Sequence, residues 1–85
     1  MINTKVLSSV FDNYDIHKVI LLDIDNTYNF IISNMPSSIS LEKWEYLENI
    51  LQEITKKNIN IFSLTQAINH FGNSIKSKGL VIKGE

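Results

Sequence analysis

The sequence contains no cysteine, no arginine, one proline and only three glycines. Without cysteine the chain has no disulfide, no thiolate metal site and no cysteine nucleophile. Its two histidines, His17 and His70, are far apart in the sequence and do not indicate a zinc cluster. The simplest expectation for such a composition is a cytoplasmic protein.

Lysine supplies all eight basic side chains, and the formal net charge is −1. Arginine is the usual residue for two-pronged contacts with bases and phosphates, and the lysines here are scattered. We therefore expect no nucleic-acid binding. The longest apolar run, 19–22, is far shorter than the roughly 20 residues that span a bilayer, and the N-terminus lacks a signal-peptide layout. We therefore expect no membrane partner.

The apolar fraction of 44% is typical of a globular chain, and residues 1–85 are expected to form a single domain. Apolar spacings of three and four predict helices over 3–14, 41–57 and 65–76. Apolar runs predict strands at 18–24, 59–64 and 80–82. The middle helix has the clearest pattern, with Ser40 as its N-cap and a stripe of six inward apolar residues, namely Leu41, Trp44, Leu47, Ile50, Leu51 and Ile54.

Segment 28–33 is open to more than one interpretation, because its composition suits a strand but also a loop or short helix that covers the core. Strands that alternate with helices favour an α/β domain with a small, mainly parallel three-stranded sheet flanked by helices. The alternative is an α+β fold, in which a turn at Asp25 and Asn26 joins 19–24 and 28–33 into a hairpin within a mixed sheet.

The motif with the most chemistry in it is Asp23-Ile24-Asp25-Asn26-Thr27, which follows the apolar strand. Carboxylates two residues apart point the same way if the extended backbone continues. At the carboxyl end of a parallel strand they would face a ligand crevice, where two oxygen donors suit Mg²⁺ and a phosphate. The purely structural interpretation is that these acids end a strand and begin a turn.

Residues 19–27 resemble the first motif of the haloacid-dehalogenase-like phosphohydrolases. The resemblance implies that Asp23 is the nucleophile, that Asp25 is the acid/base, and that both hold Mg²⁺. Residues 47–65 are similar to that family's second motif, which would make Thr65, or else Ser63, the phosphate-binding residue. The family also has an acidic pair further on, whereas the only acid after Thr65 in this chain is Glu85.

The outer face of the helix at 41–57 suggests a different role. Six residues lie off its apolar stripe, namely Glu45, Tyr46, Glu48, Asn49, Gln52 and Glu53. Such a face is ordinarily just solvated. It is also a possible partner-binding surface, because an aromatic ring supplies contact energy and charges steer encounter.

Our first hypothesis is a small intracellular protein-binding module, such as an inhibitor, an immunity protein or a phage-type regulatory protein. It would bind a protein partner or associate with itself, without a cofactor. The reason is size: 85 residues are expected to suffice for a binding surface but not for every arm of a magnesium-phosphate pocket. The alternative is a minimal or degenerate Mg²⁺-dependent phosphohydrolase, or a phosphate-binding remnant. The sequence leaves open whether the protein is an enzyme, although we favour a non-enzymatic role.

Overall fold

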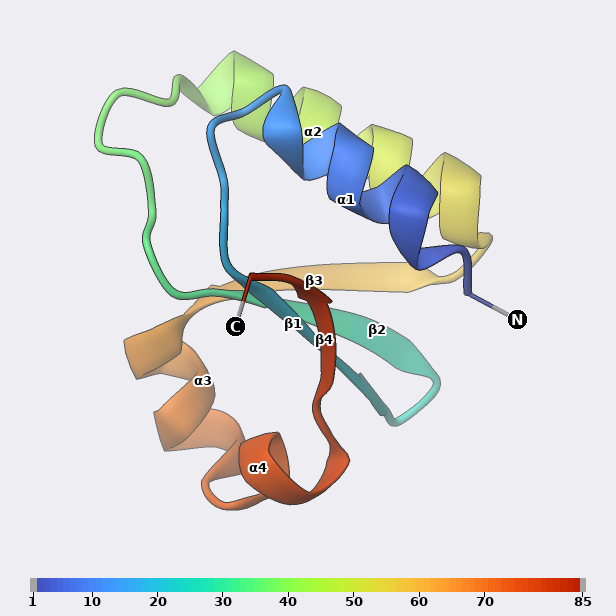
Figure 1. The fold of residues 1–85 in the computed structure, drawn as a ribbon, viewed down its shortest axis with the longest axis vertical. Coiled ribbons are helices and arrows are strands. Elements are labelled where there is room, and N and C mark those ends of the chain that lie inside the picture. Colours follow the sequence, from blue (N-terminus) through green and yellow to red (C-terminus); the bar gives the residue numbers. More distant parts are fainter. Residues whose placement is uncertain (1, 85) are drawn as a thin grey trace.

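The computed structural model describes residues 2–84, in which helices cover both faces of a four-stranded sheet. Figure 1 shows α1 and α2 over one face and α3 and α4 over the other. In chain order the elements are α1 (Thr4–Asp12), β1 (Val19–Ile24), β2 (Thr27–Ile32), α2 (Leu41–Thr55), β3 (Asn58–Ser63), α3 (Leu64–Phe71), α4 (Ser74–Lys78) and β4 (Leu80–Lys83). None of the helices within residues 2–84 has the length and apolar character needed to cross a bilayer.

The strand order is β3-β2-β1-β4, and the sheet is mixed. β1 pairs with β2 and with β4 in antiparallel fashion, and β2 pairs with β3 in parallel. The expected mainly parallel three-stranded sheet is therefore wrong, and the alternative with a hairpin is confirmed. Segment 28–33 is a strand, and its observed bounds are Thr27–Ile32.

The hairpin forms because Asp25 and Asn26 both take left-handed backbone conformations, with φ of 57° and 58°. Two such residues between the paired Ile24 and Thr27 make a two-residue turn of type I′, whose twist matches that of antiparallel strands. Asp and Asn tolerate this conformation better than other residues with a side chain. The acids that end β1 thus also reverse the chain.

β1 reads as an unbroken apolar run because it is buried on both sides. Leu21 packs in the core beneath α1 and α2, together with Phe11 and Phe30. Leu22 packs in the opposite core beneath α3, with Ile31 and Ala67. Successive strand residues alternate between the two layers, so a continuous run of apolar residues is needed to fill both.

Helix α2 has a narrower buried stripe than its sequence predicts. Leu47 and Leu51 are fully buried, whereas Leu41 is 73% exposed and Ile54 is 39% exposed. The expectation that Leu41 faces inward is wrong, because Leu41 lies about 120° around the helix from Leu47 at 100° per residue. Ser40 is the N-cap as expected, and its side chain accepts a hydrogen bond from the backbone N–H of Lys43 at 3.2 Å.

The helix expected over 65–76 is divided in two. α3 ends at Gly72, whose φ of 53° lies outside the helical region, and α4 begins at Ser74. Glycine adopts positive φ without steric cost, so it is the natural place for the break. After the break, α4 leads directly into β4 at the edge of the sheet.

Candidate functional site

The two aspartates of the first motif lie at the hairpin end of β1. Asp23 is an exposed residue of β1, and Asp25 is the first residue of the turn. The left-handed conformation of Asp25 ends the extended backbone between the two residues. The premise that their carboxylates point the same way therefore does not hold, since it requires extended geometry throughout.

The proposed phosphate-binding residues lie at the other end of the sheet. Ser63, the last residue of β3, pairs with Ile32 of β2, whereas Asp23 of β1 pairs with Tyr28 of β2. Ile32 and Tyr28 are four residues apart along β2, which corresponds to about 13 Å. β1 and β3 run in opposite directions, so their carboxyl ends lie at opposite ends of the sheet. The structure therefore does not bring Asp23 and Thr65 together.

Ser63 and Thr65 have local roles at the start of α3. Ser63 is the N-cap, and its hydroxyl accepts a hydrogen bond from the backbone N–H of Gln66 at 3.2 Å. The side chain of Gln66 accepts one in return from the backbone N–H of Ser63 at 2.9 Å. This reciprocal pair is a capping box, which satisfies two of the free N–H groups at the helix start. Thr65 is exposed in the first turn.

Within residues 2–84 no three acidic or histidine side chains gather closely enough to hold a metal ion. The arrangement at Asp23 and Asp25 consequently offers two exposed carboxylates and no third arm. A Mg²⁺ ion there would keep most of its ligands as water. Glu85, the remaining downstream acid, lies outside the described residues.

The outer face of α2 is open to solvent as predicted. Its six candidate residues fall into two rows at helical spacing, Glu45–Glu48–Gln52 and Tyr46–Asn49–Glu53. Tyr46 is 62% exposed, and of the six only Glu48 is half-buried. Glu53 pairs with Lys56 at 3.3 Å, rather than with Lys57 as helical spacing would also allow, and both side chains of that pair are largely exposed.

Lys57 is drawn away from Glu53 by the hairpin. Its ammonium group donates a hydrogen bond of 3.2 Å to the side chain of Asn26, and it lies 5.2 Å from the centre of the Tyr28 ring. Lys56 takes the left-handed conformation that ends α2, with φ of 57°. Asn58, two residues further on, begins β3. Neither Glu45 nor Glu48 forms an ion pair within residues 2–84.

An apolar strip borders the candidate face on its α1 side. Val6 is 41% exposed and Ile54 is 39% exposed, although Ile54 was expected to face inward. A hollow between the two helices is lined by Asn3 and Leu7 from the start of α1 and by Ile54 from the end of α2. The two helices therefore lie antiparallel, with Val6 and Ile54 at the same end.

The other end of the strip is formed by two tyrosines. Partial burial raises the pKa of Tyr14 above its ordinary value of 10.0, and the nearby charge of an ionised Tyr46 raises it further. Tyr46 is thus close enough to Tyr14 for their charges to interact, and Tyr14 follows the carboxyl end of α1. We call the surface of Val6, Tyr46 and Ile54, with Glu45 and Glu53 beside it, the α1/α2 surface. Sequence periodicity indicated Tyr46, but the contribution of Val6 depends on how the helices pack.

Comparisons with protein-family models, with curated proteins and with solved structures found no match for this chain.

Proposed function

We propose that the protein is a small binding module that docks on a protein partner through the α1/α2 surface. The observation that carries this proposal is the exposure of Tyr46, whose large aromatic side chain is 62% open to solvent on a well-formed helix. The fold does not depend on this side chain, because Leu47 and Leu51 are the residues that pack α2 against the core. Tyrosine is enriched at the centres of interfaces because its ring buries much area with little loss of conformational freedom.

The dimensions of the surface support the proposal. α2 has 15 residues and is thus about 22 Å long, with α1 beside it. A standard interface takes about 800 Å² from each partner. This is about one seventh of the 5617 Å² of accessible surface that the protein exposes. The outer halves of two adjacent helices are a suitable area of that size.

The charges around Tyr46 indicate the chemistry of the partner. Glu53 lies on the same side of α2 as Tyr46 and its pair with Lys56 is exposed, and the exposed Glu45 forms no ion pair within residues 2–84. Exposed charges contribute mainly to encounter rate and choice of partner. The complementary surface would therefore be an apolar pocket that receives Tyr46 and is edged by lysine or arginine.

The test is affinity capture with matched variants. The immobilised protein, Tyr46→Ser and Leu41→Ser would each be exposed to an extract of the source cells, and the retained proteins quantified by mass spectrometry. Leu41 is a suitable control because it is 73% exposed on another side of the same helix. We expect a partner that is retained by the wild type and by Leu41→Ser, and depleted about tenfold by Tyr46→Ser. Equal retention by all three proteins would rule the proposal out.

The alternative, a Mg²⁺-dependent phosphohydrolase or phosphate-binding remnant, would have to work with Asp23 and Thr65 at opposite ends of the sheet. No contact of either residue favours it over the binding module. It has a direct test of its own, given below.

A further inference from the structure

β4 is one edge of the sheet, so the outer row of its backbone N–H and C=O groups has no strand beside it among residues 2–84. An exposed edge can accept an additional strand through backbone hydrogen bonds. The two edges of this sheet differ in character. β3 exposes Asn58 and Asn60, whereas β4 exposes Leu80 and Val81, which are 46% and 52% open to solvent.

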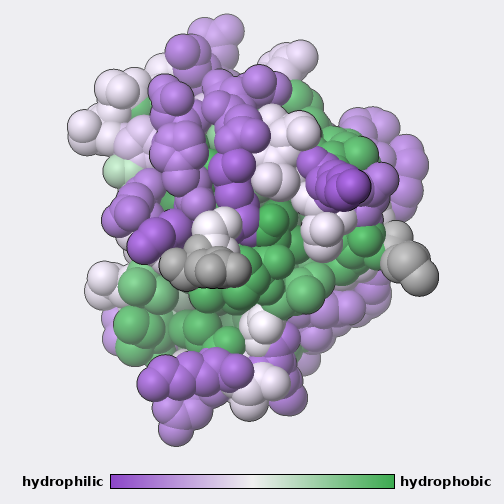
Figure 2. All heavy atoms as spheres, in the orientation of Figure 1, coloured by the Kyte–Doolittle hydropathy of each residue, from purple (hydrophilic) through white to green (hydrophobic). Residues whose placement is uncertain are grey.

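α3, which packs against β2 and β3, also carries exposed apolar side chains. Leu64 is 37% exposed and Ile68 is 54% exposed. Figure 2, in the orientation of Figure 1, shows apolar side chains gathered in a band across this face, over β4 and α3 and below the hydrophilic surface of α1. A strand added to β4 would thus border this apolar band.

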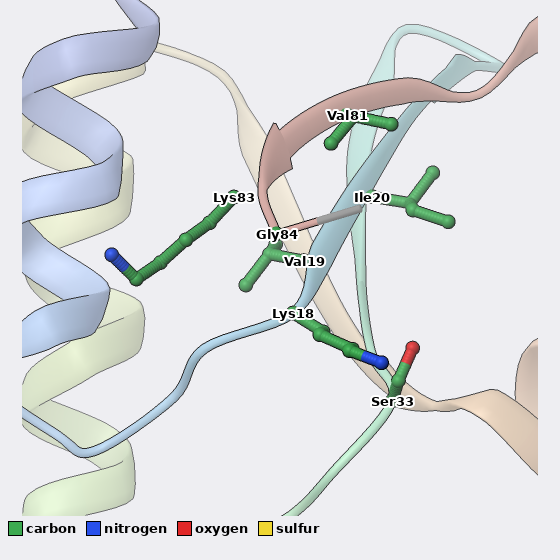
Figure 3. Close-up of a pocket in the computed structure, with 7 residues that line it drawn as sticks. All are labelled: Lys18, Val19, Ile20, Ser33, Val81, Lys83 and Gly84. Carbon is green, nitrogen blue, oxygen red and sulfur yellow. The ribbon is translucent and has the colours of Figure 1, made fainter.

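A cavity of about 200 Å³ lies at the carboxyl end of β4. Its apolar lining comes from Val19 and Ile20 of β1 and from Val81. At its mouth, the side chain of Lys18 extends towards the hydroxyl group of Ser33, while Lys83 points away towards α1 (Figure 3). Lys83 is already engaged there, because its ammonium group forms an ion pair with Asp12 and a hydrogen bond of 3.3 Å with Ser8.

The free positive charges lie at both ends of this edge. Lys18 is beside the cavity, and Lys76 and Lys78 are on α4, immediately before β4. All three are exposed, and none forms an ion pair within the described part of the chain. The nearest acid on β1 is Asp23, which lies two residues beyond Leu21, the partner of Leu80.

These charges decide what kind of occupant fits. A second copy paired antiparallel along β4 would bring the lysines of both copies to one seam, where like charges repel. The contact would also be small, because a strand of four residues is only about 13 Å long. The area that it buries would be well short of the area that a stable dimer of folded domains buries. A single extended segment needs less area and can carry the complementary charge.

We propose that the outer edge of β4, between the Lys18 cavity and the lysines of α4, binds an extended peptide segment of a protein partner in which apolar residues alternate with acidic ones. Side chains on one face of the added strand would lie against Val81. Carboxylates near its ends would meet Lys18 on one side and Lys78 on the other. This edge is separate from the α1/α2 surface, and the inference goes beyond the proposed function by adding a second docking site.

The probe is a short, capped, fluorescently labelled peptide in which valine and glutamate alternate, compared with one in which valine and lysine alternate. We expect saturable binding of the glutamate peptide, measured by fluorescence anisotropy, and binding of the lysine peptide weaker by about tenfold or more. NMR shift changes of the bound protein should centre on the backbone amides of 80–83.

Charge-reversal variants complete the test. Lys18→Glu with Lys78→Glu should weaken glutamate-peptide binding about tenfold. Lys5→Glu with Lys43→Glu makes the same change in net charge at exposed positions elsewhere and should leave binding unchanged. Equal binding of the two peptides, equal weakening by the two double variants, or a dimer that Val81→Lys abolishes would each overturn the inference. Tyr46→Ser should bind the peptide normally, so failure here and failure of the proposed function are distinguishable.

Discussion

The side-chain amide of Asn60 donates a hydrogen bond of 3.2 Å to the side-chain oxygen of Asn29, directly across the parallel pair of strands β3 and β2. Asn29 in turn donates to the backbone oxygens of Leu22 and Thr27, each at 3.2 Å. Asn29 is 3% exposed and is the one buried polar residue within 2–84. Its amide group is thus fully used, which explains how a polar side chain is tolerated among the apolar residues of the sheet.

Asn29→Asp should be strongly destabilising. A carboxylate cannot donate to the oxygens of Leu22 and Thr27, and it would be a buried charge without a partner, so we expect a loss of about 3 kcal/mol in the free energy of unfolding. Asn58→Asp is the matched control, because Asn58 is an exposed residue of β3 outside this network, and it should cost less than about 1 kcal/mol. Urea unfolding measures both losses, and equal values would contradict the assigned network.

The hairpin turn predicts opposite effects for two asparagine-to-glycine changes. Asn26 has φ of 58°, which glycine adopts freely, so Asn26→Gly should raise the melting temperature by about 2–4 °C. Asn34 is not among the residues with positive φ, so Asn34→Gly should lower stability by about 0.5 kcal/mol through the unfolded chain. Thermal unfolding followed by circular dichroism distinguishes them. Shifts of the same sign and size would argue against the type I′ turn.

Tyr14 should make the fold sensitive to alkali. Because partial burial, and then the charge of Tyr46, raise the pKa of Tyr14 in the folded protein, the unfolded chain loses this proton first. The free energy of unfolding should therefore be unaffected by this group below pH 10, and should fall between that value and the higher pKa of the folded state. Tyr14→Phe should remove this part of the fall and Tyr46→Phe should reduce it, as measured by urea unfolding across that range. An identical profile in all three proteins would show that Tyr14 is not perturbed.

The response of the protein to Mg²⁺ distinguishes the binding module from the phosphohydrolase alternative. Asp23 and Asp25 offer only two carboxylates at the turn, so we expect millimolar Mg²⁺ to leave the melting temperature unchanged and a generic phosphate ester to remain uncleaved. The same result is expected for Asp23→Asn, with Asp15→Asn as an exposed control. Mg²⁺-dependent cleavage that Asp23→Asn abolishes and Asp15→Asn retains would establish the alternative in place of the binding module.

Much of the candidate surface could be predicted from α2 alone. The spacing of Leu47 and Leu51 fixes which side of the helix is buried, and Tyr46 then necessarily lies off that side. The role of Val6 could not be predicted in the same way. Val6 fits the apolar stripe of its own helix, yet it is 41% exposed while Leu7 and Phe11 of the same helix are buried.

The exposure of the β4 edge could not be predicted from local sequence patterns either. Leu80 and Val81 read as members of a short buried strand, and their exposure follows from the strand order β3-β2-β1-β4, which puts this strand outermost. Strand order is a property of long-range pairing, and no spacing within 80–83 encodes it.

The sequence by itself determined the positions of most helices and strands and the buried Leu47 and Leu51 of α2, because side-chain periodicity and capping residues act over a few neighbouring positions. Only the tertiary structure decided that β1 turns back on β2 and that Asp23 and Thr65 lie at opposite ends of the sheet. The physical reason is that Asp25 and Asn26 suit either the end of a parallel strand or a tight reversal. That choice is made by the burial of 27–32 against both layers, to which residues from the whole chain contribute.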